Sequence, residues 1–126
     1  MTADDVRGFF DALNQGDFDT LADRMSDDVR LEFPGERFGG VFQGRRRVLV
    51  FLRQNQRMFN CGLRFSVHWA AVSDGRAVAQ WTNTGTTRDG TAYKNSGVTV
   101  FRYDGDTVVA IQDYLDTDKL SATWPA

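Results

Sequence analysis

The sequence has few of the residues from which disulfides, metal centres and redox sites are built. Its 126 residues include one cysteine, one histidine and two prolines. Cys61 has no partner for an internal disulfide, and together with His68 it does not make a cluster of metal ligands. We therefore expect no metal site and no cofactor.

Long apolar runs and an excess of charge of one sign are missing as well. The first ten residues, MTADDVRGFF, carry acids where a signal peptide needs a basic region, and no segment has the length and apolarity of a membrane span. The formal net charge of -2 gives no general attraction to nucleic acid or to anionic lipid. We expect a cytoplasmic protein whose partners include neither nucleic acid nor a membrane.

The chain does have enough apolar residues for one self-supporting core, with 41% hydrophobic and 13% aromatic residues. Residues 1–126 are therefore predicted to form a single domain. Apolar residues at helical spacing predict a helix from Thr2 to Gly16, a short helix after Asp17 and a third helix from Arg45. A strand precedes Pro34, and the stretch GERFGGVFQG is expected to be a glycine-rich loop.

The second half of the chain reads as a series of hairpins. Asp-Gly pairs at 74–75, 89–90 and 104–105 are turn signals between stretches of alternating polarity. The predicted strands are about Leu63–Ser73, Arg76–Thr87, Thr91–Tyr103 and Thr107–Leu115. Helices followed by an antiparallel meander indicate an α+β domain.

One acidic side chain interrupts the apolar face of the last predicted strand. In the stretch AIQDYLD, Asp113 has the parity of Ile111 and Leu115, because alternate residues of a strand share a face. A carboxylate among apolar neighbours loses hydration, which raises its pKa toward the range useful for a base. The alternative is a structural acid whose oxygens are satisfied by neighbouring polar groups and backbone.

Tight hairpin turns give a register for this face of the sheet. They place Gln80 opposite Gly97, and Gly97 opposite Asp113. Such a mixture of polar and apolar residues, with a gap at the glycine, is typical of a pocket for a small molecule. The residues expected to bind a substrate there are the polar Gln80, Thr82, Asn95 and Thr99, and the apolar Phe9, Leu13, Phe33, Trp69 and Leu115.

The opposite face of the predicted sheet carries Trp81, Val98, Val100 and Tyr114 and is too apolar to remain exposed to solvent. We expect a homodimer that forms through this Trp81 face. His68 is expected to pack there as well. For the tail, Leu120 to Ala126, two positions are open: over the mouth of the pocket or on the partner subunit.

Four segments together resemble the nuclear transport factor 2-like superfamily, and in particular its SnoaL-like branch. They are FFDALNQGD, DDVRLEFPG, FQGRRRVLVFL and VTVFRYDGDTVVAIQDYLD, and the resemblance covers nearly the whole chain. It implies a cone-shaped fold in which N-terminal helices pack on a curved antiparallel sheet. The fold does not by itself define an activity, because isomerases, cyclases, hydrolases and non-catalytic modules share it.

This chain lacks most of the catalytic residues of two related enzyme families. The tyrosine and two aspartates of ketosteroid isomerases fall on Phe9, Phe33 and Thr99. The catalytic aspartate of limonene epoxide hydrolases falls on Asp113, but their arginine and second aspartate fall on Gln80 and Thr82, and their water-holding tyrosine and asparagine on Leu31 and Phe33. Epoxide opening needs two proton-transfer groups, so a lone acid supplies half of that mechanism.

SnoaL-like polyketide cyclases use an aspartate late in the chain as the acid and base of an aldol-type ring closure. The resemblance implies this catalytic role for Asp113, which acts on a small hydrophobic molecule by proton transfer in a cyclisation, isomerisation or dehydration. The alternatives are a non-catalytic protein that binds a small ligand, a dimerisation module and a limonene epoxide hydrolase-like hydrolase.

Overall fold

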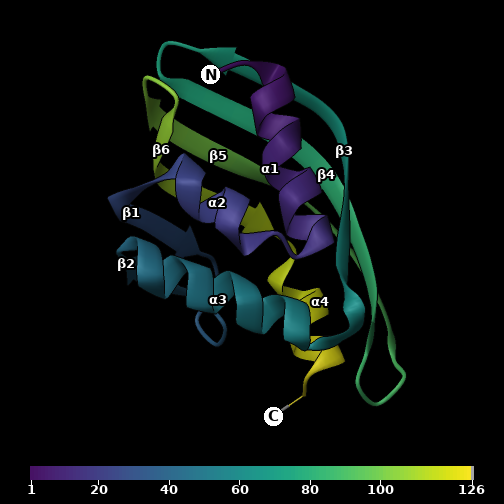
Figure 1. Ribbon diagram of the computed structural model, residues 1–126. Coiled ribbons are helices and arrows are strands. Elements are labelled where there is room, and N and C mark those ends of the chain that lie inside the picture. Colours follow the sequence, from purple (N-terminus) through teal and green to yellow (C-terminus); the bar gives the residue numbers. More distant parts are fainter. Residues whose placement is uncertain (126) are drawn as a thin grey trace.

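The computed structural model describes residues 1–125 as helices packed against the concave face of a curved six-stranded sheet (Figure 1). The helices are α1 (Ala3–Gln15), α2 (Phe18–Arg24), α3 (Arg45–Arg57) and α4 (Thr117–Thr123). The strands are β1 (Met25–Phe33), β2 (Gly40–Gln43), β3 (Phe59–Ser73), β4 (Arg76–Thr87), β5 (Ala92–Asp104) and β6 (Thr107–Leu115). The predicted α+β class is confirmed.

The strands follow the order β2-β1-β6-β5-β4-β3, and one neighbouring pair is parallel. The strands of the predicted meander, β3 to β6, pair antiparallel as expected. The prediction of an antiparallel sheet does not hold for β1, which leaves the helical half of the chain and pairs with the last strand, β6, in the same direction. The stretch predicted as a glycine-rich loop contains β2, which forms an antiparallel hairpin with β1. The sheet is therefore mixed and open, with edges at β2 and β3.

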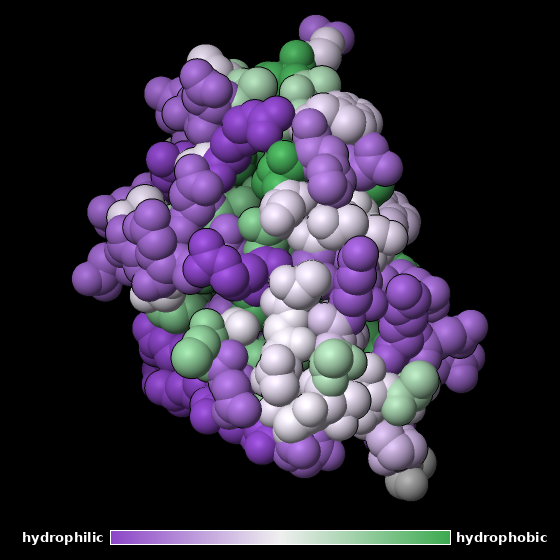
Figure 2. Space-filling view, turned by 90° about the vertical axis from the view of Figure 1, so that its right-hand side faces the viewer, coloured by the Kyte–Doolittle hydropathy of each residue, from purple (hydrophilic) through white to green (hydrophobic). Residues whose placement is uncertain are grey.

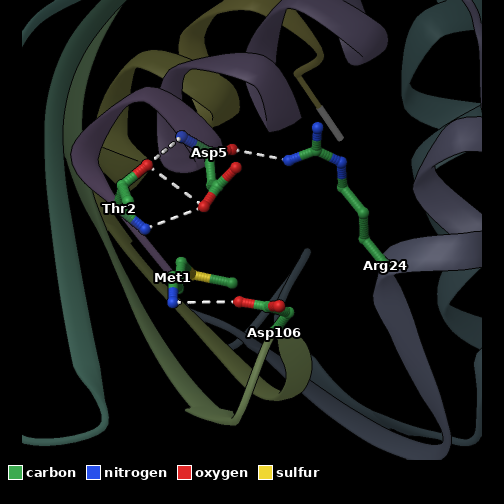
Figure 3. A network of polar contacts seen from close by, with 5 residues as sticks. All are labelled: Met1, Thr2, Asp5, Arg24 and Asp106. Atoms are coloured by element: carbon green, nitrogen blue, oxygen red, sulfur yellow. Dashed lines mark hydrogen bonds and ion pairs between the residues drawn. The ribbon is translucent and has the colours of Figure 1, made fainter.

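The start of the chain is fixed over the end of the β5–β6 hairpin (Figure 3). The backbone N–H of Asp5 donates to Thr2 Oγ1 at 3.2 Å, and the N–H of Thr2 donates to Asp5 Oδ2 at 2.8 Å, which is a capping box. Arg24 Nη1 donates to the carbonyl of Asp5 at 2.8 Å, and the ammonium group of Met1 contacts Asp106 Oδ1 at 3.1 Å. These contacts hold the N-terminus of α1 against α2 and the sheet.

The core lies between the helices and the concave face of the sheet. Phe9 and Phe10 of α1 meet Phe101 of β5 with ring centroids 5.1 and 6.0 Å apart. Leu31 of β1 and Val48 of α3 have no exposed surface. This packing fixes α1 and α3 over the sheet.

The hairpin between β4 and β5 turns through three residues, 88–90, and not through two. The N–H of Thr87 donates to the carbonyl of Thr91 at 2.9 Å and closes the loop. Trp81 consequently pairs with Gly97, and Asn83 with Asn95. The predicted register of β4 is therefore wrong by one residue, and one residue inverts both faces of a strand.

The register between β5 and β6 differs from the predicted one by two residues, which preserves the faces. Asp113 pairs with Thr99 and not with Gly97. One residue of the shift comes from the turn, where Asp104 pairs with Thr107. The other arises where the pairing of Arg102 with Ala110 changes to that of Tyr103 with Val108, so that Val109 is an extra residue in β6. Asp113 stays on the concave face, as its parity with Ile111 and Leu115 predicts.

The free edge of β3 carries hydrogen bonds from two amide side chains. Asn14 of α1 donates to the carbonyl of Phe65 at 2.9 Å and accepts from its N–H at 2.7 Å. Gln56 of α3 makes the same pair of bonds with Leu63, at 3.1 and 2.8 Å. Figure 2 shows the side that carries β3 and β4, where hydrophilic groups surround a band of neutral and hydrophobic residues.

Candidate functional site

A cavity of about 220 Å³ lies between the concave face of the sheet and the helices α1 and α3. The C-terminal segment closes part of it, because Leu120 and Trp124 belong to its wall. Most of the lining is apolar, and its few polar side chains determine which chemistry the cavity can support. The lining residues are Phe9, Phe10, Leu13, Leu31, Phe33, Phe38, Phe51, Leu52, Gln54, Asn55, Gln56, Met58, Phe59, Leu63, Phe65, Trp81, Asn83, Tyr93, Thr99, Ile111, Asp113, Leu115, Leu120 and Trp124.

Asp113 is held in this cavity by a chain of two hydrogen bonds. Trp81 Nε1 donates to Thr99 Oγ1 at 2.9 Å, and Thr99 Oγ1 donates to Asp113 Oδ1 at 2.7 Å. The direction is fixed, because an indole N–H can only donate and the threonine hydroxyl is left with its own hydrogen for the carboxylate. The carboxyl group is thereby oriented through one oxygen.

The environment of Asp113 changes its acidity. Burial raises the pKa of its carboxyl group to about 6, against the opposing effect of the hydrogen bond from Thr99. A base works best when its pKa lies near the working pH, because it is then ionised without being too weak to take a proton. Among the lining residues that the structure describes, Asp113 is the only one with a charged side chain.

The structure places most of the predicted apolar residues and one predicted polar residue in the cavity. Phe9, Leu13, Phe33 and Leu115 line it, and Thr99 does so beside Asp113. Their role as substrate contacts stays a prediction, as does the catalytic role of Asp113.

Gln80, Thr82 and Trp69 lie on the other, convex face of the sheet, so their predicted place in the pocket is wrong. Trp69 Nε1 donates to Gln80 Oε1 at 2.5 Å, and His68 Nε2 lies 3.1 Å from Thr82 Oγ1. The pairing of Trp69 with Gln80 follows the predicted hairpin. The three-residue loop between β4 and β5 turns that pair outward.

Trp81 shows the same inversion from the opposite side. The sequence predicts it on a dimer surface with His68, and this prediction is wrong: Trp81 is only 2% exposed and packs inside against Phe65, with ring centroids 4.9 Å apart. The gap predicted at Gly97 is filled by this indole. A Cβ atom at Gly97 would lie 2.7 Å from Trp81 Cη2.

Asn95 lies on the concave face behind the cavity wall. Its Nδ2 donates to Tyr93 Oη and to the carbonyl of Asp116, both at 2.9 Å, and its Oδ1 accepts from the N–H of Ser96 at 2.8 Å. Both ends of the amide are therefore used within the protein. Asn95 orients the ring of Tyr93, and it is Tyr93 that lines the cavity.

The sequence interpretation missed Asn83 and Tyr93 as cavity residues. Asn83 is 4% exposed and lines the cavity, and its Oδ1 is buried without a hydrogen-bond partner. The signal was present in the alternation of β4, since Asn83 shares the parity of Trp81. The wrong loop length assigned that parity to the convex face.

The described part of the tail lies at the cavity, one of its two open positions. Asp116 Oδ1 accepts from the N–H of Asp118 at 3.0 Å and caps α4. The ring of Trp124 packs against Phe59 and Tyr93 with centroids 5.5 and 5.8 Å apart. Ala126, the last residue of the predicted tail, lies outside the described residues.

Two kinds of feature are missing from residues 1–125. No helix there has the length and apolar character needed to cross a bilayer. No group of three or more His, Cys, Asp or Glu side chains in this part of the chain is arranged to hold a metal ion.

The model of the SnoaL-like domain matches residues 6–111. The chain belongs to this family. Its superfamily is the nuclear transport factor 2-like one, as the resemblance implied. The match ends before Asp113, so family membership alone assigns that residue no role.

Solved structures share the fold of this SnoaL-like domain at low sequence identity. Bal32a, from a soil-derived mobile gene cassette, is 22% identical with a TM-score of 0.88, over 97% of this chain and 95% of its own. A nuclear transport factor 2-like protein of unknown function from Burkholderia pseudomallei is 23% identical with a TM-score of 0.87, over 100% of both chains. An LEH-like epoxide hydrolase from M. tuberculosis is 22% identical with a TM-score of 0.78, over 95% and 81%. No curated protein matches the sequence.

Proposed function

We propose that this SnoaL-like domain is an enzyme that moves a proton on a small hydrophobic molecule, with Asp113 as the acid and base. The observation that carries the proposal is the Asp113 carboxyl group in an apolar cavity, oriented by Thr99 through a 2.7 Å hydrogen bond. The reaction class is a cyclisation, isomerisation or dehydration, in which one group takes a proton from carbon and returns it elsewhere.

The chemistry follows from the single carboxyl group. The ionised Asp113 takes a proton from a carbon next to a carbonyl group, and the electron pair of the broken C–H bond moves into an enolate. The protonated carboxyl group then returns the proton to carbon or to oxygen. With a pKa of about 6, this group both accepts and gives up a proton readily near neutral pH.

The same observation favours proton transfer over epoxide opening. Opening an epoxide with water needs one group to activate the water and a second to protonate the leaving oxygen. The described lining of the cavity offers Asp113 and no second ionised acid or cation. Leu31 and Phe33 line the cavity where that mechanism would need groups that hold a water molecule.

Hydrogen–deuterium exchange tests the proposal without knowledge of the natural substrate. Small cyclic ketones are incubated with the protein in deuterium oxide, and the loss of C–H signals next to the carbonyl group is followed by proton NMR. We expect at least one ketone to exchange faster with the wild type, and Asp113→Asn to slow this exchange by about 100-fold or more. The matched control is Asp116→Asn, which retains the oxygen that caps α4.

Two results would overturn the catalytic proposal. One is exchange that is equal in the wild type and Asp113→Asn. The other is a set of compounds that bind the cavity equally in both proteins without any exchange, which would support a non-catalytic ligand-binding protein.

We also propose that the chain forms a homodimer through the convex face of the sheet. Tyr114 and Trp69 are 51% and 45% exposed and lie in one row across the sheet, with Val98 and Gln80 between them. Light scattering should show a dimer for the wild type and a monomer for Tyr114→Asp. A monomeric wild type at micromolar concentration contradicts the proposal.

A further inference from the structure

Asn83 is the one cavity residue whose buried side-chain oxygen lacks a partner within residues 1–125. A buried amide oxygen without a donor destabilises the folded protein, and nearly all such groups are satisfied in native structures. Asn83 lines the cavity, but this oxygen has almost no accessible surface, so a molecule inside the cavity reaches it only after the carboxamide turns. A half-turn of the carboxamide offers that molecule either an acceptor or a donor.

Gln56, another amide in the cavity wall, shows what a purely structural amide looks like in this fold. Both ends of its side chain bind the backbone of Leu63, at 3.1 and 2.8 Å. Asn83 lies in the middle of the sheet between Phe65 and Asn95, where the backbone groups are used by the strands and no such partner is offered. The fold therefore satisfies one of these two amides and leaves the oxygen of the other unpaired.

Tyr93 supplies a second polar group near Asn83. Asn83 pairs with Asn95, and Tyr93 is the next residue of β5 on the same face. Tyr93 Oη accepts from Asn95 Nδ2, which leaves its own hydrogen free for a further acceptor. Burial raises the pKa of Tyr93 above its usual range, so the hydroxyl group stays protonated at neutral pH.

Asp113 and Asn83 lie at a fixed separation along the sheet. Asp113 pairs with Thr99 and Asn83 with Asn95, so they are four residues apart along β5, or about 13 Å at the rise of a strand. The indole of Trp81 covers Gly97 between them and lines the cavity. A molecule that reaches both positions therefore lies over a flat aromatic surface.

We propose that Asn83 and Tyr93 form a second polar subsite, which binds an oxygen atom at the end of the ligand remote from Asp113. The ligand class is a flat, elongated molecule of about two fused rings with an oxygen function at each end, since a cavity of about 150 Å³ takes a single benzene ring. This inference rests on the proposed function only in placing one end of the ligand at Asp113.

A matched pair of probes tests the subsite. 2,6-Dihydroxynaphthalene has a hydroxyl group at each end, and 2-naphthol lacks one of them. Affinities for both are measured by calorimetry with the wild type, Asn83→Leu and Gln80→Leu. We expect the wild type to bind the diol about tenfold more tightly than 2-naphthol, as expected for one hydrogen bond to an unpaired buried group.

Asn83→Leu should lose this preference and bind 2-naphthol at least as well as the wild type. Leucine has the same number of side-chain heavy atoms as asparagine in the same branched arrangement, and it replaces an unpaired polar group, so we expect the variant to fold with an undiminished Tm. Gln80→Leu changes an amide on the convex face of the same strand and should keep the preference for the diol. In the wild type, the side-chain amide NMR signal of Asn83 should shift more with the diol than with 2-naphthol.

The results separate this inference from the proposed function. Equal affinity of the wild type for both probes, or a preference that survives in Asn83→Leu, overturns the subsite. A preference that depends on Asn83, together with proton exchange that does not depend on Asp113, retains the subsite and overturns the catalytic role. Failure of both probes to bind contradicts the subsite as well.

Discussion

Asp113 and Asn83 lie on one concave face and line one cavity, yet the protein treats their polar groups differently. Asp113 accepts from Thr99, which in turn accepts from Trp81, so its orientation is set before any ligand arrives. Asn83 Oδ1 has no partner of its own within the described chain. A group that must transfer a proton gains from being held in advance, whereas a group that selects a ligand gains from being unsatisfied without it.

The largest expected effect is the pH dependence of proton exchange. Because Asp113 acts as a base only when ionised, and its pKa is raised by burial to about 6, exchange should rise with pH and level off above neutrality. Below the pKa the rate should fall about tenfold for each pH unit. The measurement is the NMR exchange rate across this range, with a carbon-13 titration of the Asp113 carboxyl group beside it. A titration midpoint near the ordinary value of 3.8 contradicts the expectation.

A pair of variants should give opposite changes in stability at the two positions. Thr99→Val deletes the hydroxyl group that joins Trp81 to Asp113 and leaves both without that partner, so we expect a loss of about 1 to 3 kcal/mol. Asn83→Leu deletes a group that has no partner to lose, so the free energy of unfolding should stay equal or rise. Urea denaturation measures both. Equal losses in the two variants would remove the contrast between the two positions.

A smaller effect is expected on the pH dependence of stability. The pKa of Asp113 is higher in the folded chain than its ordinary value of 3.8, so its contribution to stability is full below that value and is lost as the pH rises through about 6. Asp113→Asn has no such loss. The Tm of this variant should therefore exceed that of the wild type above neutral pH, and the difference should shrink on acidification. Thermal unfolding at several pH values measures it, and a difference that grows toward acid has the wrong sign.

The helices, the main strands and the face of Asp113 could be predicted from local patterns. Spacing of apolar residues located α3 from Arg45, and the parity with Ile111 and Leu115 placed Asp113 inward. These features depend on neighbours in the sequence. They tolerate an error of two residues in register, which is the size of the error made at the β5–β6 hairpin.

Which residues of β4 face the cavity could not be predicted in the same way, because this depends on the length of one loop. Whether residues 88–90 make a turn of two or three residues decides which face of β4 looks inward. A two-residue turn would place Gln80 on the concave face, whereas the three-residue turn places Asn83 there. The turn sequence Arg-Asp-Gly is compatible with either length, and the hydrogen bond from Thr87 to Thr91 that selects the longer one is visible only in the structure.

The amide side chains of Asn14 and Gln56 along β3 have a consequence for how this open sheet behaves among other chains. An exposed edge strand is a template to which a strand of another molecule can add, and such addition leads to aggregation. Asn14 and Gln56 already occupy the N–H and carbonyl groups of Phe65 and Leu63. These bonds block this part of the edge, so an incoming strand would first have to displace helix α1 or α3 from the sheet.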